Sequence, residues 1–296
     1  MADTKIIDYE FSYNKAAHLN DALRHLQEKG TRILAGGTDL IVRIKTDVEK
    51  PTGIIDISDV EELQSFVIDG KVEIGAAVKL SSILKVPVIR ERYMGLYEAI
   101  DSIGAVQIRN LATLAGNLCN ASPGADSAPP LLTLEASVEV ASLEGENVEK
   151  RVVPLREFFT GPGKTILKSD ELVTKIIIPS IDSDSGSAFK KISRVKLDIA
   201  KISCAVYLVA EGQIMRDIRI AVGAASAKPK RAESLERELK GKKFEQGLLE
   251  EKANLINKDI SPITDIRSTE EYRRNVAPVL VRDTIELAWK RAKGAE

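Results

Sequence analysis

The sequence predicts an α+β protein of more than one domain. Short runs of alternating apolar and polar residues, typical of strands, are mixed with segments of helical periodicity along the whole chain. The sequence contains no repeat of fixed period and no low-complexity tract. With 296 residues, the chain reaches the size, about 250–300 residues, at which a single hydrophobic core usually stops growing. We therefore expect two or three packed units.

The first segment predicts a helix followed by a strand. Gly30 ends the helix, and TRILA, residues 31–35, then has the composition of a strand. IIDI, residues 54–57, is the next predicted strand. The helix is expected over residues 15–28 because four apolar residues recur there at helical spacing, namely Ala16, Leu19, Leu23 and Leu26.

The middle of the chain predicts two hairpins, a helix and a further strand. Asp69-Gly70 separates QSFVI from KVEIGAAV and is a strong signal for a tight hairpin turn. A second hairpin is expected over residues 137–153, where apolar and polar residues alternate on both sides of a glycine. A helix is expected near residues 91–102, and a strand over residues 171–179 that ends at a proline.

A domain boundary is expected at residues 181–187. This stretch, IDSDSGS, has no apolar residue after its first position, which is the composition of a linker or an exposed loop. Beyond it, AFKKISR, KISCAVYLVAEG and QIMRDIRIAVGAA predict a three-stranded meander. Helices should follow over residues 228–241, 243–256 and 270–293, the last with one apolar face made of Tyr272, Val276, Val279 and Leu280. The predicted units are residues 1–53, 54–180 and 185–296.

Composition argues against several kinds of partner. Lys and Arg number 43 against 44 Asp and Glu, so no strong field attracts nucleic acid or a membrane surface. No window reaches the roughly 18 apolar residues of a membrane span, and the first residues lack the apolar core of a signal peptide. We expect a cytoplasmic protein. Cys119 and Cys204 are the only cysteines, so the chain cannot by itself ligate an iron–sulfur cluster or a four-cysteine zinc site, and both thiols should be buried and reduced.

The stretch LAGGTDLIVRIK, residues 34–45, places two glycines between a strand and a helix. Gly36 and Gly37 allow positive φ and let a ligand approach the backbone N–H groups closely. Thr38 and Asp39 then supply a hydroxyl and a helix cap, and the start of a helix favours phosphate. The stretch is neither a P-loop nor a GxGxxG turn. It suits a diphosphate, and an ordinary tight turn is the alternative.

A second stretch, QIRNLATLAGNLCNASPGADSAPPLL, residues 107–132, is poor in large apolar side chains. It contains a small-residue turn at 112–117 and a polar loop at 120–127, before two prolines that begin a helix. Gly116 leaves room for a flat ligand. A long structural loop is the alternative interpretation. Three side chains in this stretch can bond to phosphate or ribose, namely Thr113, Ser122 and Asp126.

Together, the two stretches resemble the FAD-binding medium subunit of the molybdenum hydroxylase family, which includes xanthine dehydrogenase and carbon monoxide dehydrogenase. That family holds its cofactor with an A-G-G-[HT]-[SD]-L turn and a T-[IL]-G-G-N turn, the latter followed by S-P-x-x-D-x-x-P-x-L. SAFKKISRVKLDIAKIS, residues 187–203, is similar to the stretch from which a lysine of the family reaches the flavin. IRSTEEYRRNVAPVLVRDTIELAW, residues 266–289, is similar to its C-terminal helix.

The resemblance implies a fold of the vanillyl-alcohol oxidase type, in which two α+β subdomains, here residues 1–53 and 54–180, clasp FAD. Residues 185–296 would form the small C-terminal α+β domain. The first glycine turn would wrap the diphosphate, mostly through main-chain N–H groups, and residues 113–117 would form the opposing wall. The implied contacts there are Ile33, Leu34, Ala35, Gly36, Gly37, Thr38, Asp39, Leu40, Thr113, Leu114, Ala115, Gly116, Asn117 and Ser122.

Three further positions are implied near the cofactor. Ile103 would contact it from the preceding helix, and Asp126 would face its adenosine side. Lys190 would lie near the isoalloxazine edge, where a positive charge favours the reduced flavin. Lys191 is the alternative, because neighbouring residues of a strand point to opposite faces and only one can serve.

The chain departs from the family pattern at two positions. Ala115 replaces the first glycine of the second turn, which adds a methyl group but leaves the main-chain contacts possible. Phe189 stands where many relatives carry Tyr, so a hydroxyl contact to the flavin is lost. His18 and His25 lie outside the cofactor motifs, so we expect the FAD to be bound without a covalent link. The extra four-iron cluster of the benzoyl-CoA-reducing branch is not expected with two cysteines.

The resemblance implies a subunit that carries electrons and does not itself activate a carbon substrate. Its partners would be a large molybdopterin-containing subunit and a small [2Fe–2S] subunit, with NAD⁺ as one candidate acceptor. A stand-alone FAD oxidoreductase of the same fold is one alternative, and its C-terminal part of roughly 110 residues would be small for a substrate-binding cap. A scaffold subunit without FAD is the other alternative.

Overall fold

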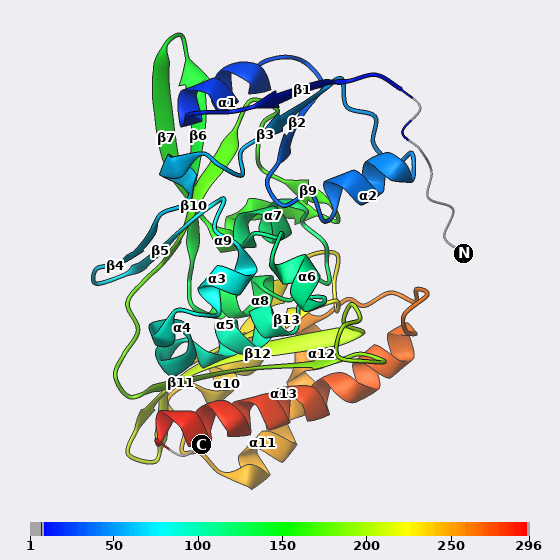
Figure 1. The fold of residues 1–296 in the computed structure, drawn as a ribbon. Helices are drawn as coiled ribbons and strands as arrows, with labels where there is room; N and C mark the ends of the chain where they lie inside the picture. Colours follow the sequence, from blue (N-terminus) through cyan, green and yellow to red (C-terminus); the bar gives the residue numbers. More distant parts are fainter. Residues whose placement is uncertain (1–6, 8, 295–296) are drawn as a thin grey trace.

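The computed structural model describes residue 7 and residues 9–294. Strands in this part of the chain form three sheets and one two-stranded ribbon. Figure 1 shows the first two sheets in the upper half of the molecule and the third sheet below them, with the C-terminal helix α13 along its lower side. The predicted α+β class is confirmed.

The first sheet is small and parallel, with the strand order β1-β3-β2. The predicted N-terminal helix forms as α1, because Leu19, Leu23 and Leu26 turn one buried face toward the core. Gly53 pairs with both Ser12 and Thr31, so the expected boundary between residues 53 and 54 falls inside β3. The elements are β1 (Ser12–Lys15), α1 (Leu19–Leu26), β2 (Thr31–Leu34), α2 (Leu40–Lys45) and β3 (Gly53–Asp56).

The second sheet is antiparallel and has the order β4-β5-β10-β6-β7. Both predicted hairpins form, and Gly70 and Gly145 take positive φ at their turns, as tight hairpins require. Its strands are β4 (Phe66–Ile68), β5 (Val72–Gly75), β6 (Ser137–Glu144), β7 (Asn147–Pro154) and β10 (Leu172–Ile178).

Short helices and a ribbon connect these strands, most of them between β5 and β6, and Figure 1 shows them between the second and third sheets. The helix predicted near 91–102 is present as α5, and α8 begins next to its two prolines as expected. The connecting elements are η1 (Glu61–Leu63), α3 (Leu80–Ile83), α4 (Pro87–Arg92), α5 (Met94–Asp101), α6 (Val106–Arg109), α7 (Leu114–Cys119), α8 (Ala128–Thr133), α9 (Leu155–Phe158), β8 (Phe159–Gly161) and β9 (Lys164–Thr165).

The third sheet has four strands, in the order β11-β12-β13-β14, which corrects the prediction of a three-stranded sheet. The fourth strand is only two residues long, too short for its alternation to be seen in the sequence. It pairs with Ala221 and Val222 at the end of β13. The elements are β11 (Ser185–Ile192), β12 (Ile202–Glu211), β13 (Ile214–Gly223), β14 (Lys230–Arg231), α10 (Glu233–Leu239), α11 (Gln246–Lys252), η2 (Ala253–Leu255), α12 (Ile256–Asp259) and α13 (Glu270–Ala292).

The long helix α13 packs on this sheet with only part of the face that was expected. Tyr272 and Val279 are exposed, whereas Arg273 is buried and donates hydrogen bonds to Lys201 O, to Ile263 O and to the Asp265 carboxylate. Of the predicted face, Leu280 is buried and Val276 packs against the core, so the prediction is right for these two residues and wrong for the two exposed ones. The buried face consists of Arg273, Ala277, Leu280, Val281, Thr284, Ile285, Ala288 and Trp289.

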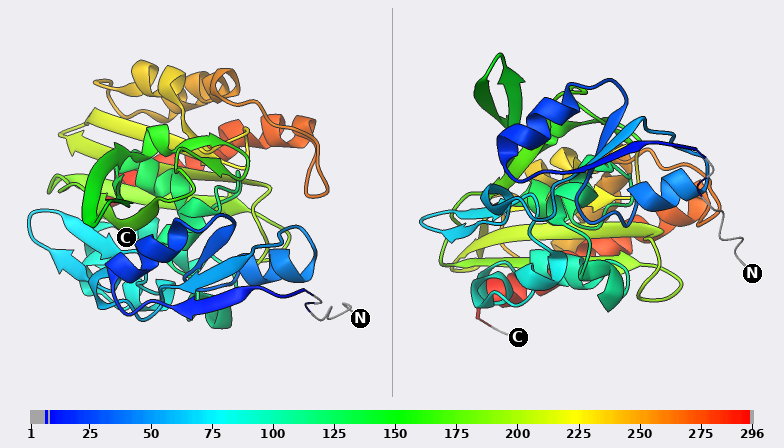
Figure 2. Two further views of the ribbon diagram at one scale, coloured as in Figure 1. Left: turned by 90° about the horizontal axis from the view of Figure 1, so that it is seen from above. Right: turned by 45° about the horizontal axis from the view of Figure 1, so that its top comes forward.

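The third sheet lies between two layers of helices. Helix α13 covers one face, and α5 and α8 cover the other (Figure 2). Tyr207, Val209 and Ala221 of this sheet belong to the hydrophobic core of the N-terminal part, so the two parts share packed apolar surface. A large apolar interface of this kind holds domains in one arrangement.

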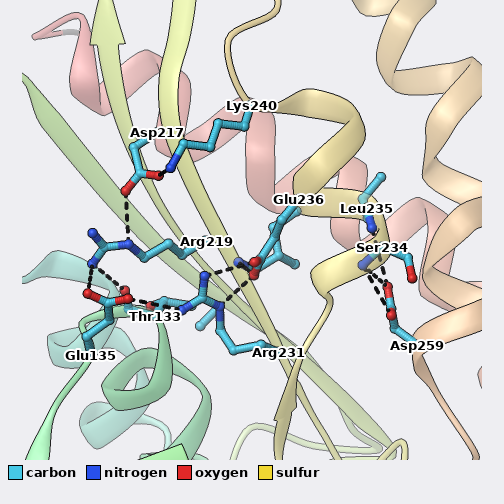
Figure 3. A network of polar contacts seen from close by, with 12 residues as sticks. Thr133, Glu135, Asp217, Arg219, Arg231, Ser234, Leu235, Glu236, Lys240 and Asp259 are labelled. Atoms are coloured by element: carbon cyan, nitrogen blue, oxygen red, sulfur yellow. Dashed lines mark hydrogen bonds and ion pairs between the residues drawn. The ribbon is translucent and has the colours of Figure 1, made fainter.

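Charged groups at one edge of the third sheet also join the two parts (Figure 3). Glu135, which follows α8, lies 3.3 Å from Arg219 on β13 and 3.8 Å from Arg231 on β14. Arg219 Nη1 also donates to Thr133 O at 3.4 Å. Arg231 in turn makes a two-bond ion pair with Glu236, at 2.6 and 2.8 Å. The C-terminal sheet is thus anchored to the segment that leads into the second sheet.

Candidate functional site

A cavity of about 530 Å³ lies where the β2–α2 turn, the segment from α5 to α8 and the loop after β11 meet. Its size falls within the range of roughly 300–1,000 Å³ that is usual for small-molecule and cofactor sites. Most of the contacts predicted from the sequence line it, namely Ile33, Ala35, Gly36, Gly37, Thr38, Asp39, Leu40, Ile103, Thr113, Ala115, Gly116, Asn117, Ser122, Asp126 and Lys191.

Three predicted contacts are not among the residues that line the cavity. Leu34 packs beneath the first glycine turn, where its Cδ1 lies 2.9 Å from the place that a Cβ on Gly37 would take. Leu114 is fully buried in the core. Lys190 lies on β11 beside Lys191, and the alternation of the strand turns it to the other face.

The first glycine turn is shaped by its contact with a distant loop. Gly37 has φ of +70°, a conformation that favours glycine. A Cβ at Gly36 would lie 2.1 Å from Leu111 O, so only glycine lets the turn approach the segment before α7 this closely. Asp39 stands at the N-cap position of α2 but makes no cap bond, since its Oδ1 accepts a hydrogen bond from Asn120 Nδ2 at 3.1 Å. The two stretches singled out in the sequence are therefore in contact.

The opposing wall is the first turn of a helix. Thr113 is the N-cap of α7, and its Oγ1 accepts a hydrogen bond from Gly116 N at 3.0 Å. Asn117 Oδ1 accepts a hydrogen bond from Ser127 Oγ at 2.6 Å, which holds the side chain in place. Ala115, the departure from the family pattern, is buried and still lines the cavity. This wall is rigid because its polar side chains are already bonded to their neighbours.

Asp126 and Lys191 form a buried ion pair in the cavity wall. Their side chains are 6% and 7% exposed, and Lys191 Nζ lies 2.9 Å from Asp126 Oδ2. The ammonium also donates to Ser102 O at 2.8 Å and to Asp198 O at 3.1 Å, so its three N–H groups all have acceptors. Asp126 Oδ1 is buried and has no hydrogen-bond partner. Burial raises the pKa of Asp126, and the positive charge of Lys191 opposes that rise.

The strand register places Lys191, of the two candidate lysines, at the cavity. Phe189, two residues before Lys191, packs against Ala99 of α5 on the cavity side of the sheet. Ala188, two residues before Lys190, packs in the core beneath α13. Because side chains alternate along a strand, Lys191 shares the face of Phe189 and Lys190 shares that of Ala188.

The sequence reasoning missed several residues of the cavity lining. Arg43 Nη2 pairs with Glu49 Oε1 at 3.1 Å, and Arg32 Nε lies 3.8 Å from the same carboxylate. The buried Nε of Arg43 has no partner. Leu197 and Ile199, on the loop after β11, also line the cavity. No local pattern marks these residues, although the two apolar ones lie within the stretch, residues 187–203, that carried the resemblance.

The two cysteines are free thiols. Cys204 is buried as expected, whereas Cys119 is only partly buried and lines the cavity, which corrects the prediction for that residue. The side chain of Cys119 is inaccessible enough that burial raises the pKa of its thiol to about 12. It is therefore a neutral part of the wall at ordinary pH.

Residue 7 and residues 9–294 offer neither a metal site nor a membrane span. No group of three or more His, Cys, Asp or Glu is placed there to hold a metal ion. Over the same residues, no helix is both long enough and apolar enough to span a bilayer.

Known proteins match almost the whole chain. The FAD binding domain in molybdopterin dehydrogenase matches residues 9–181, and the CO dehydrogenase flavoprotein C-terminal domain matches residues 187–288. The glyceraldehyde dehydrogenase medium chain of Sulfolobus acidocaldarius is 35% identical over 92% of this chain and 95% of its own. The xanthine dehydrogenase FAD-binding subunit of Escherichia coli O157:H7 is 31% identical over 96% of this chain and 97% of its own.

A solved structure agrees with these matches. A chain of carbon monoxide dehydrogenase from Hydrogenophaga pseudoflava has a TM-score of 0.92 and 28% identity, and the match covers 97% of this chain and 99% of that one. The fold and the cavity thus define an FAD-binding oxidoreductase subunit. The chain belongs to the FAD-binding medium subunits of the molybdopterin dehydrogenases, the family of the xanthine and carbon monoxide dehydrogenases.

Proposed function

We propose that this chain carries non-covalent FAD in the cavity and serves as the electron outlet of a molybdenum hydroxylase complex. Electrons would come from a small [2Fe–2S] subunit, after a large molybdopterin-containing subunit has oxidised the organic substrate. They would leave to NAD⁺ or to another acceptor. The single observation that supports this most directly is that both glycine turns and β11 line one cavity.

The residues of the cavity fit FAD in chemistry and in shape. The glycine turn at residues 36–39 lines the cavity, where its main-chain N–H groups could bind a diphosphate. Ile103, Leu197 and Ile199 offer apolar surface for a flat ring system. The unpartnered Asp126 Oδ1 lines the same cavity and can accept a hydrogen bond from an N–H or O–H of the cofactor. FAD supplies the redox chemistry, because it exchanges one or two electrons at a time.

The side chains of the cavity suit binding and placement better than acid–base catalysis. All four carboxylates of the lining have polar partners. Asp126 pairs with Lys191 and Glu49 with Arg43. Asp198 pairs with Arg194, and Asp39 accepts a hydrogen bond from Asn120. The pKa of Cys119, about 12, keeps its thiol protonated at neutral pH. None of the residues that line the cavity is a histidine. A stand-alone oxidase would need a free general base near its substrate, so this arrangement favours the electron-transfer role.

Co-purification tests the proposal. A tagged chain purified from its native host should bring down a molybdenum-containing subunit and a [2Fe–2S] subunit, with one FAD for each chain. Metal analysis of the purified complex measures its molybdenum and iron, and the flavin absorbance measures the FAD content of each chain. A flavin-loaded chain that purifies alone, and that oxidises an organic substrate by itself, would instead establish a stand-alone enzyme.

A further inference from the structure

Helix α5 and strand β11 are joined by three polar contacts at regular spacing. Residues 95, 98 and 102 lie on one face of the helix and its C-cap, because helical residues three or four apart are neighbours. Residues 187, 189 and 191 lie along one face of the strand, since alternate residues point the same way. The contacts are Gly95 N to Ser187 Oγ at 3.0 Å, Phe189 N to Glu98 Oε2 at 2.9 Å, and Lys191 Nζ to Ser102 O at 2.8 Å.

The middle contact is part of a larger arrangement at the free edge of the sheet. β11 is an edge strand, so N–H and C=O groups on its outer side have no neighbouring strand to pair with. Glu98 accepts the N–H of Phe189, and Arg291 of α13 donates to Ser187 O at 2.8 Å. Arg291 also makes two hydrogen bonds to Glu98, at 2.6 and 3.0 Å. Two side chains from different helices thus take the place of the second neighbouring strand that β11 lacks.

The edge contacts lie directly before the cavity. Phe189 is two residues before Lys191, one repeat along the same face of β11. A displacement of the strand at Phe189 would move the Lys191 ammonium away from Asp126, which comes from a different part of the chain. Close packing leaves little room for such a shift, because a Cβ at Gly95 would already lie 3.0 Å from Ala188 N. The position of β11 against α5 therefore sets the position of Lys191 in the cavity.

We propose that Glu98, held by Arg291, is a positioning residue of the cofactor site. Its carboxylate fixes β11 against α5 so that Lys191 meets Asp126 in the cavity wall. This inference rests on the proposed role of the cavity as the FAD site. Glu98 is absent from the residues that line the cavity, so its effect on the cofactor must pass through β11 and Lys191.

A double-mutant cycle on FAD affinity tests this route. Glu98→Ala and Lys191→Ala should each weaken FAD binding about tenfold, the usual effect of losing a supporting residue. The double variant should bind FAD no more weakly than Lys191→Ala alone, because Glu98 acts through that lysine. Fluorescence quenching of FAD on binding to the apoprotein gives the four dissociation constants. If Glu98→Ala does not fold, Arg291→Lys takes its place in the cycle. A lysine lacks the guanidinium group that bonds to both the Glu98 carboxylate and Ser187 O.

Glu236 provides a matched control. Like Glu98, it accepts a strand N–H, that of Ile220 at 2.7 Å, and pairs with an arginine, Arg231 at 2.6 Å (Figure 3). It lies beside β13, away from the cavity. Glu236→Ala should lower the unfolding temperature about as much as Glu98→Ala and leave FAD affinity unchanged.

Three results would overturn the inference. The first is an unchanged FAD affinity in Glu98→Ala. The second is an equal loss of FAD affinity in Glu98→Ala and Glu236→Ala. The third is a double variant in which the losses of FAD affinity from Glu98→Ala and Lys191→Ala simply add. Failure of the proposed FAD site gives a different result, since the wild-type apoprotein would then not bind FAD at all.

Discussion

Lys191 Nζ lies 2.9 Å from Asp126 Oδ2 and joins the C-terminal domain to the N-terminal part inside the cavity. Both side chains are almost fully buried, so each charge depends on the other for its stability. The pair comes from residues 65 positions apart in the sequence. The cavity wall is therefore complete only when the two domains are packed together.

Lys191→Met should lower the reduction potential of bound FAD, whereas Lys190→Met should leave it unchanged. Removing the ammonium takes away a positive charge in the cavity wall, and a screened charge a few ångströms from a redox group changes its potential by roughly tens of millivolts. Potentiometric titration of both loaded variants measures the effect. A wild-type potential in both variants would show that neither lysine tunes the cofactor.

Gly36→Ala should abolish FAD retention and lower the stability of the fold by about 1–3 kcal/mol, because its Cβ would overpack the contact with Leu111 O. Gly247→Ala is the control, since a Cβ there meets nothing within 4 Å. Flavin absorbance after gel filtration, with circular dichroism to check folding, gives the comparison. A folded Gly36→Ala protein that holds full FAD would contradict the close approach of the two turns.

Glu73 should make part of the stability depend on pH. Hydrogen bonds from Lys175 and then from Lys71, each at 2.6 Å, lower the pKa of its carboxyl below the usual value. A carboxyl with a lowered folded pKa stabilises the protein above its unfolded pKa, and this stability is lost as pH falls through the folded pKa. At neutral pH, Glu73→Gln should therefore lower the free energy of unfolding by about 1 kcal/mol and with it the unfolding temperature. The difference from wild type should vanish in acid. Thermal unfolding of both proteins from neutral to acid pH tests this, with Glu149→Gln at an exposed glutamate as the control. A difference in unfolding temperature that persists in acid would refute the assigned role of Glu73.

Cys119 should resist alkylation in the folded protein. Because burial raises the pKa of its thiol to about 12, almost no reactive thiolate is present at neutral pH. Iodoacetamide should label neither cysteine under native conditions and both after denaturation. Mass spectrometry of the digested protein reads out each site. Fast native labelling of Cys119, lost in Cys119→Ser, would show that the cavity wall opens readily.

The sequence was informative where function depends on short stretches of backbone. The glycine pair at Gly36-Gly37 predicted a turn between a strand and a helix from the local residues alone, and Gly37 takes positive φ there. The fold class and both hairpins followed from periodicity and from Asp69-Gly70. These features need no knowledge of how distant segments pack.

Contacts between distant segments could not be predicted in the same way. Asn120 bonds to Asp39 across 81 positions, and the Arg291 guanidinium meets Glu98 across 193. Neither pair has a sequence signature, since charged residues of this kind are common on any surface. The burial of Arg273 likewise had no local signal, and of the predicted face of α13 only Val276 and Leu280 pack inward. Such features depend on tertiary packing, which a single sequence does not specify locally.

The most direct test of the central claim follows the flavin absorbance of the purified, FAD-loaded chain while possible electron donors are added one at a time. The account predicts that the band is bleached by the reduced [2Fe–2S] partner subunit. It also predicts that purines, aldehydes, aromatic acids and carbon monoxide leave it unchanged when no partner is present. Bleaching by any of these substrates with the single chain, in a sample shown to be free of molybdenum, would contradict the role of an electron outlet and establish an independent oxidase.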